Sequence, residues 1–260
     1  MKNDLFSIGP FTVHGYGLMI AIGVLSAYYM VEYRAKKKQM DWEKVFPLTV
    51  WSVLGGFLGS KILYLLTRLP DILANPALLG SSIKDGFVVY GGIIGGILTA
   101  WIYCKCTKWN FWKIFDIAMP AVAMAQGFGR IGCLLAGCCY GRELDPANPI
   151  GIVFHNSAYA PNDVALLPTQ IISSVLDFAN CFVLLANKKE DGQVTACYLI
   201  FYSIGRFVLE YFRGDLIRGN VGEFSTSQFI SLFICLIGFV LLFGLPVLAK
   251  KKGACAQSEE

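Results

Sequence analysis

The apolar run "FTVHGYGLMIAIGVLSAYYMVEY" (residues 11–33) is followed directly by "RAKKKQMDWEK" (residues 34–44). The first stretch is long enough to cross a bilayer as one helix, since a span needs about 20 mostly apolar residues. The second stretch carries five basic residues, which favour the cytoplasmic side of a membrane. Because the run is long and has only Lys2 as a basic residue before it, it predicts a retained membrane helix and not a cleaved signal peptide.

The composition extends this prediction to the whole chain. Of its 260 residues, 55% are hydrophobic and only 15% are charged, whereas a soluble domain has about a quarter of its residues charged. These values predict a polytopic all-α membrane protein. The net charge of +4 is too small to favour a nucleic-acid partner, and we expect no cofactor.

Apolar runs recur along the chain and indicate a seven-helix bundle that forms one polytopic domain, residues 1–260. The basic residues of the connectors alternate, with "RAKKKQMDWEK", 105–113, "NKKED" (187–191) and "KKK" (250–252) richer than the connectors between them. The positive-inside rule then places the N-terminus outside and the C-terminus in the cytoplasm. The predicted spans are about 11–33, 46–67, 87–104, 114–135, 168–186, 194–213 and 226–248.

Several ionisable residues interrupt these spans, where a charge is costly and suggests function. They include Lys61, Arg130 and Asp177, and the stretch "GRFVLEYFRGD" (205–215) ends the sixth span. In that stretch Arg206, Glu210 and Arg213 are spaced i, i+4, i+7, which puts them on one helix face. One interpretation is a buried ion network that holds helices together. The other is an anion site near the outer interface, because excess guanidinium groups fit a phosphate.

The segment "GRIGCLLAGCCYGRE" (129–143) places three thiols beside Arg130. A structural zinc site uses four ligands in C-x₂₋₄-C spacing. The pattern C-x₄-C-C of Cys133, Cys138 and Cys139 offers no indicated fourth ligand, so we expect no metal. Arg130 lies one turn from Cys133 and would lower a thiol pKa, so redox chemistry or a structural disulfide stays open. The thiols could also be small residues at a tight turn.

Glycines recur about four residues apart in "GGFLGSK" (55–61) and "GGIIGG" (91–96). Such spacing lets helices approach closely in lipid. Either these glycines serve helix packing alone, or the close approach also makes room for a lipid chain or headgroup.

Taken together and in order, these motifs resemble those of the prolipoprotein diacylglyceryl transferase family. G-R-x-G at 129–132, closing with Gly141, resembles the family signature. Gln228 opens the last span as it does in the family. Five further stretches resemble family elements: "SIGPFTVHGYGLM" (7–19), "GGFLGSKILY" (55–64), "YGGIIGG" (90–96), "LPTQ" (167–170) and "GRFVLEYFRGD".

Departures from the family pattern mark the chain as a divergent member. Tyr90 stands where the family usually has a histidine, Cys133 where it has an asparagine, and Lys61 where it has an arginine. Cys138 stands near a usual glutamate. Around the P-T-Q element, Leu167 and Ser173 replace a histidine and a glutamate. Either of the two histidines, His14 or His155, could stand in for the missing one.

The resemblance implies a bacterial cell-membrane enzyme that moves a diacylglyceryl group from phosphatidylglycerol to the lipobox cysteine thiol of a prolipoprotein. Its partners would be phosphatidylglycerol, prolipoprotein signal peptides and membrane lipid. Two other functions stay open: a thiol-redox membrane protein that uses the three cysteines, and a lipid-binding or transport paralogue without catalysis. The implied catalytic residues are Arg130, Arg206, Glu210, Tyr16 and Tyr90, and the implied substrate-binding residues are Gly91, Gly92, Gly129, Gly141, Arg213, Gln170 and Lys61.

Overall fold

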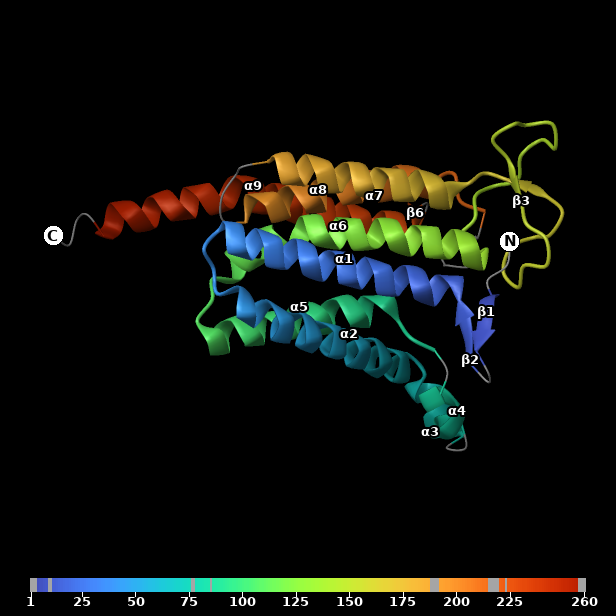
Figure 1. Ribbon diagram of the computed structural model, residues 1–260, viewed down its shortest axis with the longest axis horizontal. Coiled ribbons are helices and arrows are strands. Elements are labelled where there is room, and N and C mark those ends of the chain that lie inside the picture. The colour runs from blue at the N-terminus through green and yellow to red at the C-terminus, as the bar shows by residue number, and fades with distance from the viewer. Residues whose placement is uncertain are drawn as a thin grey trace. The chain divides into compact units, whose positions relative to one another are not determined.

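The computed structural model describes residues 4–8, 11–75, 78–84, 86–187, 192–214, 220–222 and 224–256. Helices dominate these residues, and three short antiparallel hairpins pair β1 with β2, β3 with β4 and β5 with β6 (Figure 1). The helices are α1 (Gly15–Lys37), η1 (Trp42–Lys44), α2 (Val45–Thr67), α3 (Leu69–Ala74), α4 (Leu78–Lys84), α5 (Val89–Thr107), α6 (Phe111–Ala136), α7 (Thr169–Ala186), α8 (Gln193–Glu210) and α9 (Thr226–Ala256). The strands are β1 (Asp4–Ile8), β2 (Phe11–His14), β3 (Ile152–Val153), β4 (Ala165–Leu166), β5 (Asn220–Val221) and β6 (Phe224–Ser225).

Six of the described helices, α1, α2, α5, α6, α7 and α9, are long and apolar enough to cross a membrane. The remaining predicted span, the sixth, corresponds to α8, which is 18 residues long but more polar, because it carries Arg206 and Glu210. Several predicted bounds also shift. Residues 11–14 form strand β2 ahead of α1, and α8 ends at Glu210, before the predicted residue 213. Helix α9 continues to Ala256, beyond the predicted residue 248.

The distribution of side chains is that of a membrane protein. Phe46, Phe57 and Leu58 of α2 each leave 61% of their surface exposed, whereas soluble monomers rarely expose large contiguous apolar patches. Polar side chains lie inside, among them Gln170, Asp177 and Ser231. An apolar exterior suits contact with lipid, and polar side chains in the interior are kept away from it.

The described chain forms two compact units, one of residues 31–114 and one of residues 1–30 and 115–260. The unit of residues 31–114, called unit 2, is built on α2 and α5. A Cβ at Gly59 would lie 2.4 Å from the Gly91 carbonyl oxygen, and one at Gly95 would lie 2.3 Å from that of Gly55. The two helices therefore touch backbone to backbone, which is the packing role that the glycine spacing predicts.

The unit of residues 1–30 and 115–260, called unit 1, contains α7 to α9 and most of α1 and α6. Its apolar core includes Met119, Leu184 and Tyr198. Asp116 of α6 is 1% exposed, and its carboxylate accepts bonds from Gly192 N (2.6 Å), Thr195 N (2.8 Å) and Thr195 Oγ1 (2.7 Å). A carboxylate at a helix N-terminus satisfies unpaired N–H groups and the helix dipole, so Asp116 fixes where α8 begins against α6.

Candidate functional site

The predicted motifs of unit 1 meet at the end of this unit where α6 and α8 end and α7 and α9 begin (Figure 1). After α6, Gly141 donates its N–H to the Leu167 carbonyl (3.0 Å) and forms an isolated bridge with Arg213. A Cβ at Gly141 would lie 2.6 Å from the Leu167 oxygen. Only a glycine fits at this crossing, so Gly141 joins the segments that follow α6 and α8 to the one that precedes α7.

Arg206 and Glu210 face one another on α8, as their spacing predicts, whereas Arg213 follows the end of the helix and reaches the same carboxylate from there. Arg206 Nη2 lies 2.9 Å from Glu210 Oε2, which lies 4.0 Å from Arg213 Nε. Arg206 also donates to Ser227 Oγ of α9 (3.0 Å). Little of these charged groups is exposed, so the network links α8 to α9 within a low-dielectric interior.

The beginning of α9 is built to hold Glu210. Ser225 Oγ accepts the N–H of Gln228, and Gln228 Oε1 accepts the N–H of Ser225, which is a reciprocal capping box. The same Ser225 hydroxyl donates to Glu210 Oε1 (3.2 Å). Gln228 therefore affects Glu210 indirectly, because it holds Ser225 in the capping box.

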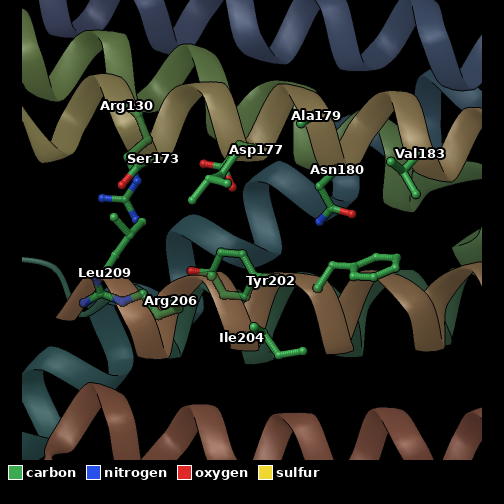
Figure 2. Close-up of a pocket in the computed structure, with 13 residues that line it drawn as sticks. Arg130, Ser173, Asp177, Ala179, Asn180, Val183, Tyr202, Ile204, Arg206 and Leu209 are labelled. Carbon is green, nitrogen blue, oxygen red and sulfur yellow. The ribbon is translucent and has the colours of Figure 1, made fainter. Parts of the chain in front are cut away.

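A pocket of about 280 Å³ lies between α7 and α8, with Arg130 of α6 in its wall. Arg130 and Arg206 lie at one end, Asp177 lies between this end and Asn180, and Val183 lies at the far end (Figure 2). The rest of the lining is largely apolar and includes Leu176, Ala179, Phe201, Ile204 and Leu209. The pocket therefore has the polarity of an amphiphile, with cationic groups at one end and an apolar body.

Asp177 and Asn180 are among the pocket residues that the predicted site did not include, although the sequence singled out Asp177 as an ionisable residue within a span. Asp177 interacts electrostatically with Arg130 and Arg206, so the site contains two carboxylates against the three guanidinium groups of Arg130, Arg206 and Arg213. Asn180 is 8% exposed, and neither polar atom of its side chain has a hydrogen-bond partner among the described residues. The signal in the sequence is the polar stripe 170, 173, 177, 180 along an otherwise apolar helix.

Tyr16, at the beginning of α1, lies against the signature on α6. A Cβ at Gly132 would lie 3.2 Å from Tyr16 Cδ2, and Tyr16 interacts electrostatically with Arg130 and with the three cysteines. Gly129 has open space at its Cβ position. Tyr16, Gly129 and Arg130 are thus neighbours at one end of the bundle.

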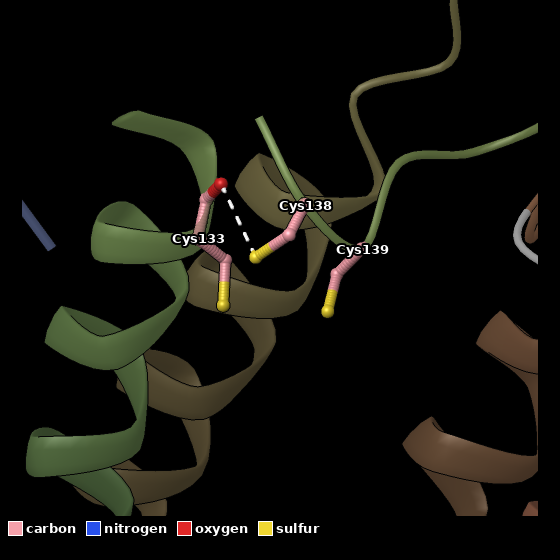
Figure 3. A group of neighbouring side chains, drawn as sticks. All are labelled: Cys133, Cys138 and Cys139. Atoms are coloured by element: carbon pink, nitrogen blue, oxygen red, sulfur yellow. Dashed lines mark hydrogen bonds between the residues drawn. The ribbon is translucent and has the colours of Figure 1, made fainter. Parts of the chain in front are cut away.

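The three thiols of the signature also gather here (Figure 3). The Sγ atoms of Cys133, Cys138 and Cys139 all lie within 4.8 Å of one another. Hydrogen bonds with the Cys133 and Cys138 thiols, together with the Arg213 guanidinium, lower the pKa of Cys139. No disulfide joins any of the cysteines whose side chains the structure describes.

The P-T-Q element holds the cysteine loop from the side of α7. Thr169 Oγ1 donates to the Cys139 carbonyl and Gln170 Nε2 donates to the Cys138 carbonyl, each at 2.9 Å. Gln170 is buried, and its Oε1 has no hydrogen-bond partner among the described residues. Gln170 therefore contacts the cysteine loop through its amide nitrogen.

The remaining predicted residues belong to unit 2. Lys61 Nζ donates to the carbonyls of Ser82 (3.3 Å) and Gly86 (3.0 Å) and lies over the Phe87 ring. Tyr90 lies in the first turn of α5 and is 44% exposed. Gly91 and Gly92, the next two residues of α5, face α2, because a Cβ at either would meet a carbonyl oxygen of that helix.

The two histidines lie outside the pocket lining. His14 ends β2, where it pairs with Asp4. His155 pairs with Asp163 at 2.6 Å, and both side chains are mostly exposed. His155 is therefore a loop histidine.

These observations define a multi-helix membrane protein with an amphiphile-shaped pocket and buried guanidinium groups at one end. Residues 3–244 of the chain match the sequence model of a protein family described as "Prolipoprotein diacylglyceryl transferase". The chain belongs to this family.

Its relatives agree over nearly the full length. It is 43% identical over 254 residues to the phosphatidylglycerol–prolipoprotein diacylglyceryl transferase of Clostridium tetani, covering 96% of this chain and 100% of that protein. It is 45% identical over 255 residues to the second enzyme of that name in Clostridium perfringens, covering 97% and 98%. A relative of the same name in Staphylococcus carnosus is 30% identical, covering 91% and 88%.

Proposed function

We propose that this chain transfers the diacylglyceryl group of phosphatidylglycerol to the lipobox cysteine thiol of prolipoproteins. The observation that carries the proposal is the pocket between α7 and α8, where Arg130 and Arg206 lie at one end of an apolar lining. A phospholipid has the same division between an anionic phosphate and apolar chains. The full-length relatives named for this reaction support the same substrates.

In this reaction the substrate thiol loses its proton and its sulfur attacks a glycerol carbon of the lipid. The C–S bond forms as the C–O bond to the phosphate breaks, and glycerol phosphate leaves with the bonding electrons. The enzyme need supply no nucleophile of its own. Its task is to position two substrates and to stabilise the negative charge on the leaving phosphate.

The geometry suggests roles for the residues around the pocket. Arg130 and Arg206 bind the phosphate as bidentate donors, and Glu210 orients Arg206 through their 2.9 Å pair. Arg213 adds positive charge at the same end. Tyr16 hydrogen-bonds the headgroup or the thiolate.

Further roles follow from the family resemblance. Tyr90 of unit 2 occupies the family's histidine position, with the role of proton acceptor. In unit 1, Gln170 and Gly141 hold the backbone beside the headgroup. The resemblance implies substrate contact also for Gly129 of unit 1 and for Gly91, Gly92 and Lys61 of unit 2.

The enzyme spans the bacterial cell membrane seven times, with α8 as the sixth span, the N-terminus outside and the C-terminus in the cytoplasm. The alternation of basic connectors supports this orientation. It places Arg130 and Arg213 at the outer interface, where the phosphates of outer-leaflet lipids lie. The exported precursor reaches the site from that side.

Arg130→Ala tests the proposal. Wild-type and variant proteins would be purified in detergent and given phosphatidylglycerol vesicles and a lipobox peptide, and the thioether product measured by mass. We expect the variant to insert in the membrane and to lose transfer by at least about 100-fold, the loss typical of removing one charge-stabilising donor. Arg68→Ala, which removes an exposed arginine paired with Asp71, is the matched control. Wild-type turnover by Arg130→Ala would overturn the assignment.

A further inference from the structure

We propose, against the expectation of no metal drawn from the cysteine spacing, that Cys133, Cys138 and Cys139 form a three-ligand binding site for one soft d¹⁰ cation, of the class of Zn²⁺ and Cu⁺. The proposal goes beyond the transfer reaction, in which these thiols have no assigned step. Their Sγ atoms all lie within 4.8 Å of one another at the end of α6. Thiolates are the side chains that select such ions.

The separations suit a three-coordinate site. A Zn–S bond is about 2.3 Å long, so three sulfurs around one ion in a plane are about 4.0 Å apart. The three thiols need to close by less than about 1 Å to reach that geometry. Figure 3 shows the Cys138 sulfur turned toward Cys133, while the Cys133 and Cys139 sulfurs point the same way. Side-chain rotation alone can supply such a movement.

The backbone holds the three residues in this arrangement. Cys139 has φ 62° and Gly137 has φ 76°, so the chain turns back on α6 through two left-handed residues. Such a conformation is costly for a residue other than glycine and persists only where the surroundings impose it. Here the surroundings are the bonds from Cys138 N to the Cys133 carbonyl (3.1 Å) and from Thr169 and Gln170 to the loop carbonyls.

The charge around the thiols also fits an ion. Three thiolates and a divalent cation carry a net charge of −1, which is costly in a partly buried place unless it is balanced. The Arg213 guanidinium interacts with Cys139, and Arg130 interacts electrostatically with Cys133. These guanidinium groups stabilise the thiolates.

Binding requires no oxidant or reductant. Each thiol that becomes a ligand gives its proton to solvent, so one ion releases up to three protons and no electron is transferred. The ion would join the end of α6 to the loop before α7. Because it binds the folded protein, it would also raise the thermal stability of unit 1.

Cadmium is a suitable probe, because it is a d¹⁰ ion whose bonds to thiolates absorb in the ultraviolet. Full-length protein in detergent, reduced with a phosphine, would be titrated with Cd²⁺ and then alkylated for peptide mass mapping. We expect one Cd²⁺ per chain, thiolate absorption, and protection of Cys133, Cys138 and Cys139 alone. Zn²⁺ should displace the cadmium, and a chelator should restore alkylation.

Two variants complete the experiment. The triple variant C133S/C138S/C139S should lose the stoichiometric binding and the rise in melting temperature, whereas Cys106→Ser, which alters an exposed cysteine of unit 2, should bind as the wild type does. If the triple variant does not fold, the protection pattern of the wild-type protein decides. Protection of other cysteines, or no protection, would overturn the proposal. The proposal would also be overturned if the three cysteines resisted alkylation and only a reductant restored their reaction, because that result would indicate a disulfide.

Discussion

Glu210 lies between two guanidinium groups, with its Oε2 atom 2.9 Å from Arg206 Nη2 and 4.0 Å from Arg213 Nε. Arg213 follows the end of α8, and Arg206 and Glu210 lie in its last two turns. The Glu210 carboxylate therefore restrains both arginines, and this restraint keeps the guanidinium groups oriented before an anion binds.

Glu210→Gln tests this restraint. The substitution keeps the side-chain volume but leaves Arg206 buried without its carboxylate, and breaking a buried ion pair from one side costs about 3–5 kcal/mol. We expect a lower melting temperature together with a loss of transfer, measured by thermal unfolding and by thioether mass. Glu143→Gln, at an exposed position, should change neither. A Glu210→Gln protein with wild-type stability and turnover would refute the restraint.

Ser227→Ala tests how α9 positions Arg206. The Ser227 hydroxyl accepts a bond from Arg206 Nη2, and one net hydrogen bond of this kind is worth about 1.4 kcal/mol, or tenfold. We expect about a tenfold loss in kcat/KM for phosphatidylglycerol, restored by Ser227→Thr.

A nearby serine gives the control for Ser227. Ser231, one turn further along α9, donates to the Ser227 carbonyl of its own helix. Ser231→Ala should retain wild-type kinetics. Equal losses in both variants would mean that the effect is structural and unrelated to Arg206.

Asn180→Leu separates stability from binding. The buried Asn180 amide has no hydrogen-bond partner among the described residues, and an unsatisfied buried polar group costs about 1–3 kcal/mol. We expect the leucine variant to melt at a higher temperature and to bind phosphatidylglycerol about tenfold more weakly, because the lipid loses one hydrogen-bonding group. A vesicle-binding measurement alongside thermal unfolding checks both. Unchanged lipid affinity would remove Asn180 from the binding site.

Gly95→Ala and Gly96→Ala form a matched pair on α5. A Cβ at Gly95 would lie 2.3 Å from the Gly55 carbonyl oxygen, whereas one at Gly96 would lie 3.4 Å from that of Ser52. Alanine has a higher intrinsic helix propensity than glycine, so both substitutions raise the local helix propensity by the same amount. We expect Gly95→Ala to lower the melting temperature and Gly96→Ala to maintain or raise it. The opposite order would contradict the α2–α5 packing.

Labelling in intact cells tests the proposed orientation. Ala147 is exposed in the connector between α6 and α7, which we place outside. Ala147→Cys should react with a membrane-impermeant maleimide added to cells. The native Cys106, exposed in the last turn of α5 at the end that we place in the cytoplasm, should react only after lysis. Labelling in the reverse order would invert the topology and move the arginine end of unit 1 to the cytoplasmic side.

The sequence by itself determined the helical membrane class, the approximate bounds of the helices and the shared face of Arg206 and Glu210. These properties depend on local periodicity, since span length and i, i+4 spacing are fixed by helix geometry. The glycine spacing likewise predicted that α2 and α5 approach closely. The family motifs, read in order, predicted the lipid substrate class.

Only the tertiary structure decided which distant residues share the pocket. Asp177 and Asn180 of α7 meet Arg130 of α6 and Arg206 of α8 because these helices pack side by side. The three thiols converge because left-handed turns at Gly137 and Cys139 reverse the chain. Such contacts depend on packing and loop geometry between segments far apart in the chain, and no local pattern encodes them.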